Sequence, residues 1–314
     1  MTSYEKAVRK TRKQLAQITL EQQRDVLKSY ERAIDNLATK LSRVRDKTLT
    51  QRWLKDYKKE LEKVRKSLTA ELESQITKSV GKAALKGAQT EQQLLLEAFS
   101  GTGLNVKPSF SKMFSAVQKN VIDDIVSGGL YTDHKTLSSR IWNTTQLFEG
   151  DIQSMITQGI LEKKSALSLA RDLEKFVKPE AQRGWEWGKV YPNLKHTKID
   201  YNAQRLARTS INHAYQTATI QSAAKNPYID KIKWLSANIH GRTCDLCAER
   251  DGQLFPVDDV PLDHPNGLCT MISVPSRSLD QIADELNSWA KGELNPMLDD
   301  WYDKNGDYFA FKKI

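Results

Sequence analysis

The residues best suited to chemistry are three cysteines and one histidine gathered in a short stretch. Cys244, Cys247 and Cys269 are the only cysteines of the 314-residue chain, and His264 lies between the second and the third. A Cys-x-x-Cys pair in a tight turn directs two thiolates to one point, and a second pair can complete a tetrahedron. Thiolate and imidazole donors together favour zinc. Because four protein ligands leave no position for water, we predict a structural zinc site.

Three other roles are open to these thiols: a redox Cys-x-x-Cys pair, a disulfide, or small buried side chains. A redox pair would have a preceding strand and a helix opening at its first cysteine. Here the pair precedes a turn at Gly252, and a further cysteine and a histidine can supply two more ligands. We therefore expect metal ligation, and expect the segment between the ligands to form turns rather than a long helix.

The N-terminal part of the chain is predicted to be a long helical region. The first eighty residues contain neither Gly nor Pro, and apolar residues recur at steps of three and four over 26–44 and again over 57–80. This spacing predicts two amphipathic helices. The polar segment 46–50 interrupts the pattern, so we expect a helical hairpin rather than one unbroken rod.

The basic charge of the chain is concentrated in the same region. Residues 1–90 hold 22 Lys and Arg against 11 Asp and Glu, whereas the whole chain has a net charge of +9. Such a surface can attract nucleic acid or an acidic protein, or can simply be a solvated helix face. As candidate contacts with nucleic acid or a partner we name the densest group, which comprises Lys55, Lys58, Lys59, Lys63, Arg65 and Lys66.

Shorter elements follow. The pattern predicts helices over 110–125, 137–156, 166–177 and 203–224, a loop anchored by tryptophans over 178–198, strands over 231–236, 253–256 and 271–274, and a last helix through 289. Ser278 and Gln281 form a capping box at the start of that last helix. The metal would clip a sheet that has too few apolar residues to be stable alone.

The predicted fold class is α+β and predominantly helical. It has a long N-terminal helical hairpin, a helical middle region and a small C-terminal α+β domain clipped by the metal. We expect a basic helical region at 1–105, a helical middle with the tryptophan-rich loop at 106–200, the metal-clipped domain at 201–290 and an acidic, aromatic tail at 291–314.

Composition bears on the compartment. Hydrophobic residues make up 39% of the chain, no run approaches the ~20 apolar residues of a membrane span, and the N-terminus lacks the apolar core of a signal peptide. We expect a soluble protein with no membrane anchor, synthesised in a cytoplasm. Reduced thiols there favour metal ligation over a disulfide.

The order of several motifs over about 110–280 resembles one known family, the minor head proteins of tailed bacteriophages with a head morphogenesis, or phage Mu F-like, domain. The resemblance rests on Arg140-Ile-Trp142, Gly159-Ile160, Ser165, Ala207-Arg-Thr209, Asn212, Tyr215, Trp234, Cys244-x-x-Cys247, Asp251-Gly252, Phe255-Pro256, His264-Pro-Asn266 and Cys269. Two positions depart from it. Ser210 stands where the family often has an acidic residue, which leaves the polar role of that helix open, and Gly267 stands where it often has a cysteine.

The resemblance implies a non-enzymatic, low-copy virion component that lies in the capsid interior near the portal and acts in head assembly, DNA packaging or ejection. Portal protein is then the expected partner, with capsid or scaffolding protein and packaged DNA as further contacts.

Two rival functions remain. A zinc-stabilised His-metal nuclease would use His264 beside Asp263, with His240 and Asn266 as the nearby candidates for further ligands, although their spacing does not suit that role. A nucleic-acid-binding protein outside any virion would show salt-dependent binding by residues 1–90 without association with portal. The other histidines, His134, His196 and His213, are expected to be surface or packing residues.

Overall fold

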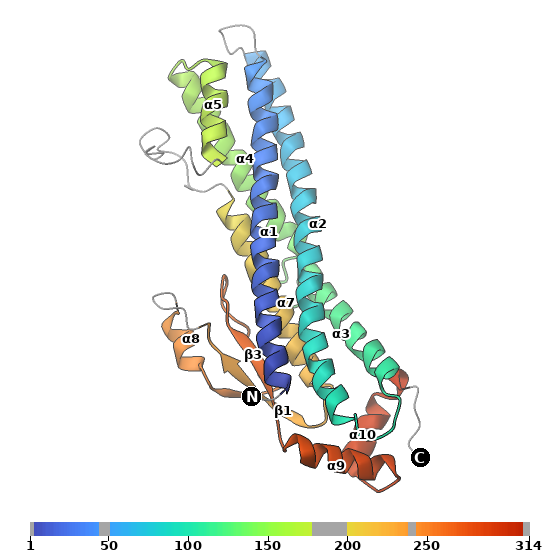
Figure 1. Ribbon diagram of the computed structural model, residues 1–314. Coiled ribbons are helices and arrows are strands. Elements are labelled where there is room, and N and C mark those ends of the chain that lie inside the picture. The colour runs from blue at the N-terminus through green and yellow to red at the C-terminus, as the bar shows by residue number, and fades with distance from the viewer. Residues whose placement is uncertain (1–2, 44–50, 178–199, 238–242, 310–314) are drawn as a thin grey trace. The chain divides into compact units, whose positions relative to one another are not determined.

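The computed structural model describes residues 3–43, 51–177, 200–237 and 243–309. The elements are α1 (Ser3–Ser42), α2 (Gln51–Ala98), α3 (Lys107–Ser127), α4 (Leu137–Leu161), α5 (Ala166–Val177), α7 (Tyr201–Ala223), β1 (Ile229–Leu235), α8 (Asp245–Arg250), β2 (Leu254–Pro256), β3 (Thr270–Pro275), α9 (Leu279–Ala290), α10 (Pro296–Lys304) and a 3₁₀ turn at Gly306–Tyr308 (Figure 1). The predominantly helical α+β fold is confirmed.

The chain forms two compact units, each assembled from separate segments. Unit 1 contains residues 1–19, 78–125 and 208–314, and unit 2 contains residues 20–77 and 126–207. The long helices α1 and α2 contribute to both units, so the units do not coincide with the contiguous ranges expected from the sequence. The tryptophan-rich loop expected at 178–198 lies outside the described residues.

Unit 2 contains the part of the predicted hairpin at residues 20–77, which includes the end of α1 and the start of α2. α1 and α2 are separate helices, and the expected turn at 46–50 lies outside the described residues. Gln75 donates a hydrogen bond to Ser29, and Lys40 pairs with Glu60, so residue numbers rise on α1 as they fall on α2. The helices therefore run antiparallel here. Their apolar face packs on α4, where the rings of Tyr30 and Phe148 meet edge to face at 5.5 Å.

Unit 1 is built around a small antiparallel sheet with strand order β2-β1-β3. The three predicted strands are thereby confirmed, with small shifts in their ends. Ile232 and Trp234 of β1 are fully buried and share a core with Tyr4 of α1 and Leu94 of α2. The hydroxyl of Tyr4 also accepts a hydrogen bond from the backbone N–H of Ser273 in β3. The sheet is thus stabilised by the start of α1 and the C-terminal end of α2 (Figure 1).

α2 and α7 approach each other very closely in unit 1. A Cβ built on Gly87 would lie 2.7 Å from the backbone oxygen of Tyr215 and 2.9 Å from Cβ of Ala218. Only glycine leaves room for α7 at that distance. This contact fixes α7 behind the sheet, and α7 in turn carries the polar side chains that hold the cysteine loop.

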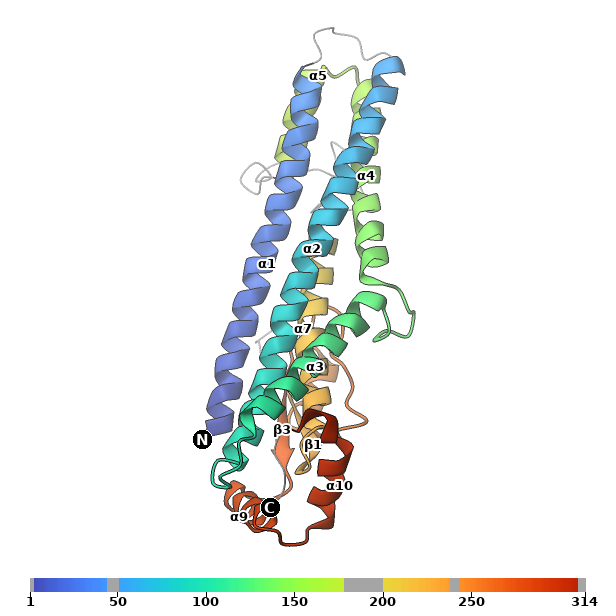
Figure 2. The same ribbon diagram turned by 90° about the vertical axis from the view of Figure 1, so that its right-hand side faces the viewer.

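The C-terminal segment was expected to be a tail, and the structure corrects that expectation. Asn295 caps α10 through a hydrogen bond from the backbone N–H of Leu298, and Pro296 occupies the first turn. Trp301 of α10 packs 5.8 Å from Phe99 in the same aromatic core as Trp289 of α9. α9 and α10 lie side by side next to the start of α3 (Figure 2). The tail is therefore part of unit 1, because its apolar residues complete that core.

The last predicted helix begins as expected, with both hydrogen bonds of the Ser278–Gln281 capping box present. None of the described helices combines the length and the apolar character that crossing a membrane requires.

Candidate metal centre

The Cys-x-x-Cys pair lies on a short helix, which corrects one expectation. Cys244 is the N-cap residue of α8, and Cys247 is buried in its first turn. A helix therefore does open at the first cysteine, a feature that a redox pair shares. α8 has only six residues and is followed by Gly252 at φ +79°, where the left-handed backbone favours glycine. Geometry around the pair must decide its role.

The four predicted ligands converge on Cys247. Cys244, Cys247 and His264 form one group whose ligand atoms lie within 4.8 Å of one another, and Cys247, Asp263 and Cys269 form a second. Cys244 Sγ lies 3.3 Å from His264 Nε2. All three cysteines are free thiols. The predicted ligands therefore fall in two overlapping groups that share Cys247, and Asp263, which is not among the predicted ligands, belongs to the second group.

The donor set and its spacing fit a tetrahedral ion. With Zn–S bonds of about 2.3 Å, neighbouring ligands of tetrahedral zinc lie about 3.8 Å apart. Within each of the two groups the ligand atoms lie within 4.8 Å of one another and need only small side-chain rotations to reach that spacing. The imidazole also has a suitable orientation, since His264 Nδ1 donates to the backbone oxygen of Pro265 at 3.0 Å. That bond leaves Nε2 facing Cys244, the arrangement typical of a metal-ligating histidine.

Asp263 organises the loop that carries the later two ligands. Its side chain is fully buried and accepts hydrogen bonds from the backbone N–H of His264 at 2.9 Å, from that of Cys269 at 2.8 Å and from Asn212 Nδ2 at 3.1 Å. The Cys247 thiol also lies 3.7 Å from Asp263 Oδ1. One carboxylate thus connects both halves of the cluster. In the sequence, the feature that could have identified Asp263 is its position directly before His264.

Gly267 is required by this carboxylate. A Cβ at position 267 would lie 2.1 Å from Asp263 Oδ2, well inside van der Waals contact. In this chain Asp263 occupies the space beside Gly267. Cys269 is the one cysteine of this loop.

Helix α7 holds the loop from behind through polar side chains. Gln216 accepts from the backbone N–H of Asp263 and donates to the backbone oxygen of Cys269. His213 Nε2 lies 2.9 Å from the backbone oxygen of Asp263. These bonds satisfy backbone groups that burial would otherwise leave unpaired. The polar role that Ser210 had left open belongs to its neighbours on α7.

The tip of the same loop is tied to α7 as well. Arg208 donates to Asn266 Oδ1 at 2.7 Å, and the hydroxyl of Thr209 accepts from the backbone N–H of Asn266. Asn266 has φ +70°, a conformation that costs energy for a residue other than glycine, and these two bonds stabilise it. Asn266, a candidate ligand of the nuclease alternative, has its side-chain oxygen bonded to Arg208. His240, the other candidate, lies outside the described residues.

The surroundings shift the pKa of the exposed thiol and of the two buried thiols in opposite directions. The backbone N–H of Cys247 lowers the pKa of Cys244, with His264 contributing in the same direction. Burial raises the pKa of both Cys247 and Cys269 above the ordinary thiol value. The hydrogen bond to Pro265 raises the pKa of His264. Cys244 is therefore the thiol most ready to ionise, and a bound cation would be needed to hold the buried pair as thiolates.

One side of the cluster faces a cavity of about 410 Å³, lined by Arg208, Ala237, Thr243, Cys244, Cys247, His264, Asn266, Gly267, Leu268 and Cys269. Cys244 is exposed, whereas Cys247 and Cys269 are buried. An ion could therefore enter past Cys244 and be held from behind by the buried thiols.

The six basic candidates occupy a different part of the chain, on α2 in unit 2. Lys63 and Lys66 pair with Glu60 and Glu62, and the partly buried Arg65 pairs with Glu149. The guanidinium of Arg65 also lies 5.7 Å from the ring of Trp142. The remaining three, Lys55, Lys58 and Lys59, are exposed. Whether any of them contacts nucleic acid or a partner stays a prediction.

Comparison with known proteins agrees with the sequence motifs. Residues 150–271 match the family model described as Phage Mu protein F like protein, so this part of the chain is similar to that family. No curated protein matches the chain, and no solved structure matches it. The matched range includes α7, β1, α8, β2 and the loop that ends at Cys269.

Proposed function

We propose that this chain is a minor head component of a tailed phage, present in low copy inside the capsid near the portal and acting in head assembly, DNA packaging or ejection. The single observation that carries this proposal is the Phage Mu protein F like match over residues 150–271. The expected direct partner is portal protein, with capsid or scaffolding protein as a further partner. The role is structural and requires no catalytic step.

A structural zinc ion is part of the proposal. Cys244, Cys247, His264 and Cys269 would hold the ion, which would connect α8 to the loop that follows β2. Asp263 would position that loop, as its contacts with both halves of the cluster suggest. The three-stranded sheet is small, and β2 has only three residues, so a metal crosslink beside it would add needed stability.

Association with heads tests the function. A phage with an early stop codon in this gene should still assemble capsid shells, and its particles should have reduced infectivity. The protein supplied in trans should co-purify with portal protein from assembled heads. A matched control is a chain with Lys291→Gln, an exposed substitution away from the matched domain. Absence of the protein from purified heads would reject the proposal.

The nuclease alternative predicts a different result. Metal-dependent turnover of DNA by the purified chain, lost in His264→Ala while the fold is retained, would favour an enzyme. A structural ligand should instead act on stability, because its loss removes the crosslink rather than a chemical step.

A further inference from the structure

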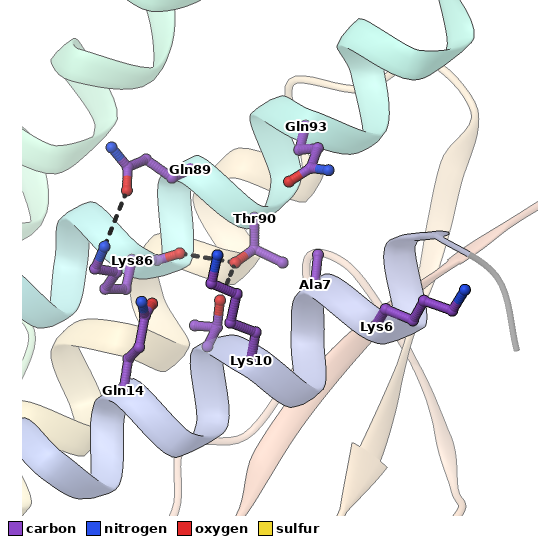
Figure 3. A pocket seen from close by; sticks show the side chains of 9 residues that line it. Lys6, Ala7, Lys10, Gln14, Lys86, Gln89, Thr90 and Gln93 are labelled. Carbon is purple, nitrogen blue, oxygen red and sulfur yellow. Dashed lines mark hydrogen bonds between the residues drawn. The ribbon is translucent and has the colours of Figure 1, made fainter.

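A polar groove lies between α1 and α2 in unit 1, away from the cysteine cluster. It has a volume of about 340 Å³ and is lined by Lys6, Ala7, Lys10, Thr11, Gln14, Lys86, Gln89, Thr90 and Gln93 (Figure 3). The residues come in similar numbers from the two helices, which converge on the groove from both sides.

The groove is positively charged, and its lysines form no salt bridges within the described part of the chain. Lys6 and Lys10 come from α1 and Lys86 from α2, and none of the described lining residues is acidic. No salt bridge within the described part of the chain involves these three lysines, whereas Lys63 and Lys66 of unit 2 pair with carboxylates. The positive field of the groove is therefore not neutralised locally.

The basic surface extends beyond the groove along α1. A neighbouring hollow is lined by Lys6, Arg9, Lys10, Arg12 and Lys13. Glu5 is the single acidic residue among residues 3–19. An extended anion with regularly spaced charges would follow this surface better than one small anion would.

The floor of the groove is fixed and polar. Thr90 donates to the backbone oxygen of Lys86 at 2.9 Å, and the hydroxyls of Thr11 and Thr90 lie 2.8 Å apart. Lys86 Nζ lies 3.5 Å from Gln89 Oε1, at the long limit of a hydrogen bond (Figure 3). Glutamine amides on both walls add neutral donors. Lysine and amide donors are the groups that proteins use to bind phosphate oxygens.

We propose that this groove binds the phosphodiester backbone of duplex DNA without sequence preference. No aromatic side chain lines it, so it offers no platform on which unpaired bases could stack, as single-strand sites require. Lysines bound to phosphates supply affinity but carry no sequence information. The inference rests on and deepens the proposed function, because packaged DNA would be the duplex met inside a head. It places the DNA contact on α1 and on the C-terminal part of α2 instead of on residues 55–66.

The test compares two charge-matched triple variants of the full chain. The first is Lys6→Gln, Lys10→Gln, Lys86→Gln in the groove. The second is Lys55→Gln, Lys58→Gln, Lys59→Gln, three exposed lysines of unit 2. Affinity for a mixed-sequence duplex is measured by fluorescence anisotropy over a series of salt concentrations. Single-stranded oligothymidylate of equal length and polyglutamate serve as competitors.

We expect the groove variant to lose at least about tenfold in affinity and the slope of log affinity against log salt to fall by about 2.7, since each lost phosphate contact removes about 0.9. The other triple should retain the parent slope. Duplex should compete better than oligothymidylate or polyglutamate. Circular dichroism checks folding, and Lys10→Gln alone, expected to lower the slope by about 0.9, serves if the triple is unfolded.

Parent-like binding by the groove variant, an equal loss in the second triple, or no DNA binding by the parent would each overturn the inference. Equal competition by polyglutamate would overturn it in favour of an acidic protein partner. None of these results bears on whether the protein co-purifies with heads, which is the test of the proposed function. The two ideas can therefore fail separately.

Discussion

Asp263 Oδ2 accepts a hydrogen bond of 2.8 Å from the backbone N–H of Cys269, six residues further along the chain. This bond closes the loop that carries His264, and Asn212 donates to the same oxygen from α7. The carboxylate therefore determines where the last thiol lies relative to Cys247. Zinc affinity should depend on Asp263 even if the residue never bonds to the ion.

Replacement of Asp263 by Asn tests this role. Asparagine keeps the shape but presents an NH₂ group where the carboxylate accepts from backbone N–H groups, so the loop should lose part of its order. We expect zinc affinity to fall by about 10–100-fold, the range found for groups that orient metal ligands. Competition with a chromophoric chelator measures it. Asp258→Asn, on the exposed segment between β2 and the loop, is the control and should bind as the parent does.

Gly267→Ala probes the same carboxylate by steric contact. The new Cβ would lie 2.1 Å from Asp263 Oδ2, so the loop must shift, and we expect the free energy of unfolding to fall by about 1–3 kcal/mol. Urea unfolding measures the change. Gly150→Ala in α4 is the control, because nothing lies within 4 Å of its Cβ, and helix propensity should make it neutral or slightly stabilising. Equal stability of the two variants would contradict the packing argument.

A buried carboxyl group in the core of unit 1 should make stability depend on pH. Tyr4 donates to Glu91 Oε1 at 2.6 Å, and burial raises the pKa of Glu91 from 4.5 to about 7. The folded state keeps this proton between those values while the unfolded state loses it. The contribution of Glu91 is therefore complete below pH 4.5 and is lost as pH rises through 7, by about 3 kcal/mol at about 1.36 kcal/mol per pKa unit.

Glu91→Gln should remove that dependence. The difference in free energy of unfolding between parent and variant should change by about 3 kcal/mol from pH 4.5 to 7 and then level off. Taking the difference cancels groups that titrate equally in both proteins. Glu97→Gln, at a less buried position of α2, is the matched control. A parent and a Glu91→Gln variant with parallel pH profiles would show that Glu91 titrates normally.

Helices and strands were predictable because their signals are local. The spacing of Tyr30, Ile34 and Leu37 gave α1 its buried face, and the capping box at Ser278 marked the start of α9. The helix α10 was missed, although Asn295-Pro296 is a regular helix start, since the acidic residues around Trp301 favoured a tail. Its burial depends on Phe99, about two hundred positions away in the chain.

In the candidate site, too, the features set by local sequence spacing were predictable and the long-range contacts were not. Sequence spacing suggested Cys244, Cys247, His264 and Cys269 as one ligand set, and the structure places them in two overlapping groups that share Cys247. The supports of the cluster were not predictable, because Gln216 meets Asp263 only in the folded chain, across 47 residues of sequence. The close approach at Gly267 likewise depends on how the loop folds on Asp263. Positioning contacts of this kind have no fixed sequence separation.

Zinc itself gives the most direct test of the candidate centre. Protein purified under reducing conditions should contain about one zinc per chain, by elemental analysis, because the four predicted ligands lie in two overlapping groups that share Cys247. Cys247→Ser should lose the most affinity, since Cys247 belongs to both groups of ligand atoms, and Cys244→Ser should lose less. A chelator should lower the melting temperature of the parent, because an ion that binds only the folded state stabilises it.

The same chelator should leave the melting temperature of Cys247→Ser almost unchanged, because that variant has little bound zinc to lose. Ala248→Ser, next to the pair and outside the cluster, is the matched control and should respond as the parent does. The redox alternative predicts the opposite pattern. Substoichiometric zinc, no effect of the chelator, and a reversible Cys244–Cys247 disulfide under mild oxidation would together assign these thiols to redox chemistry, because free thiols at a helix start exchange readily when no ion holds them.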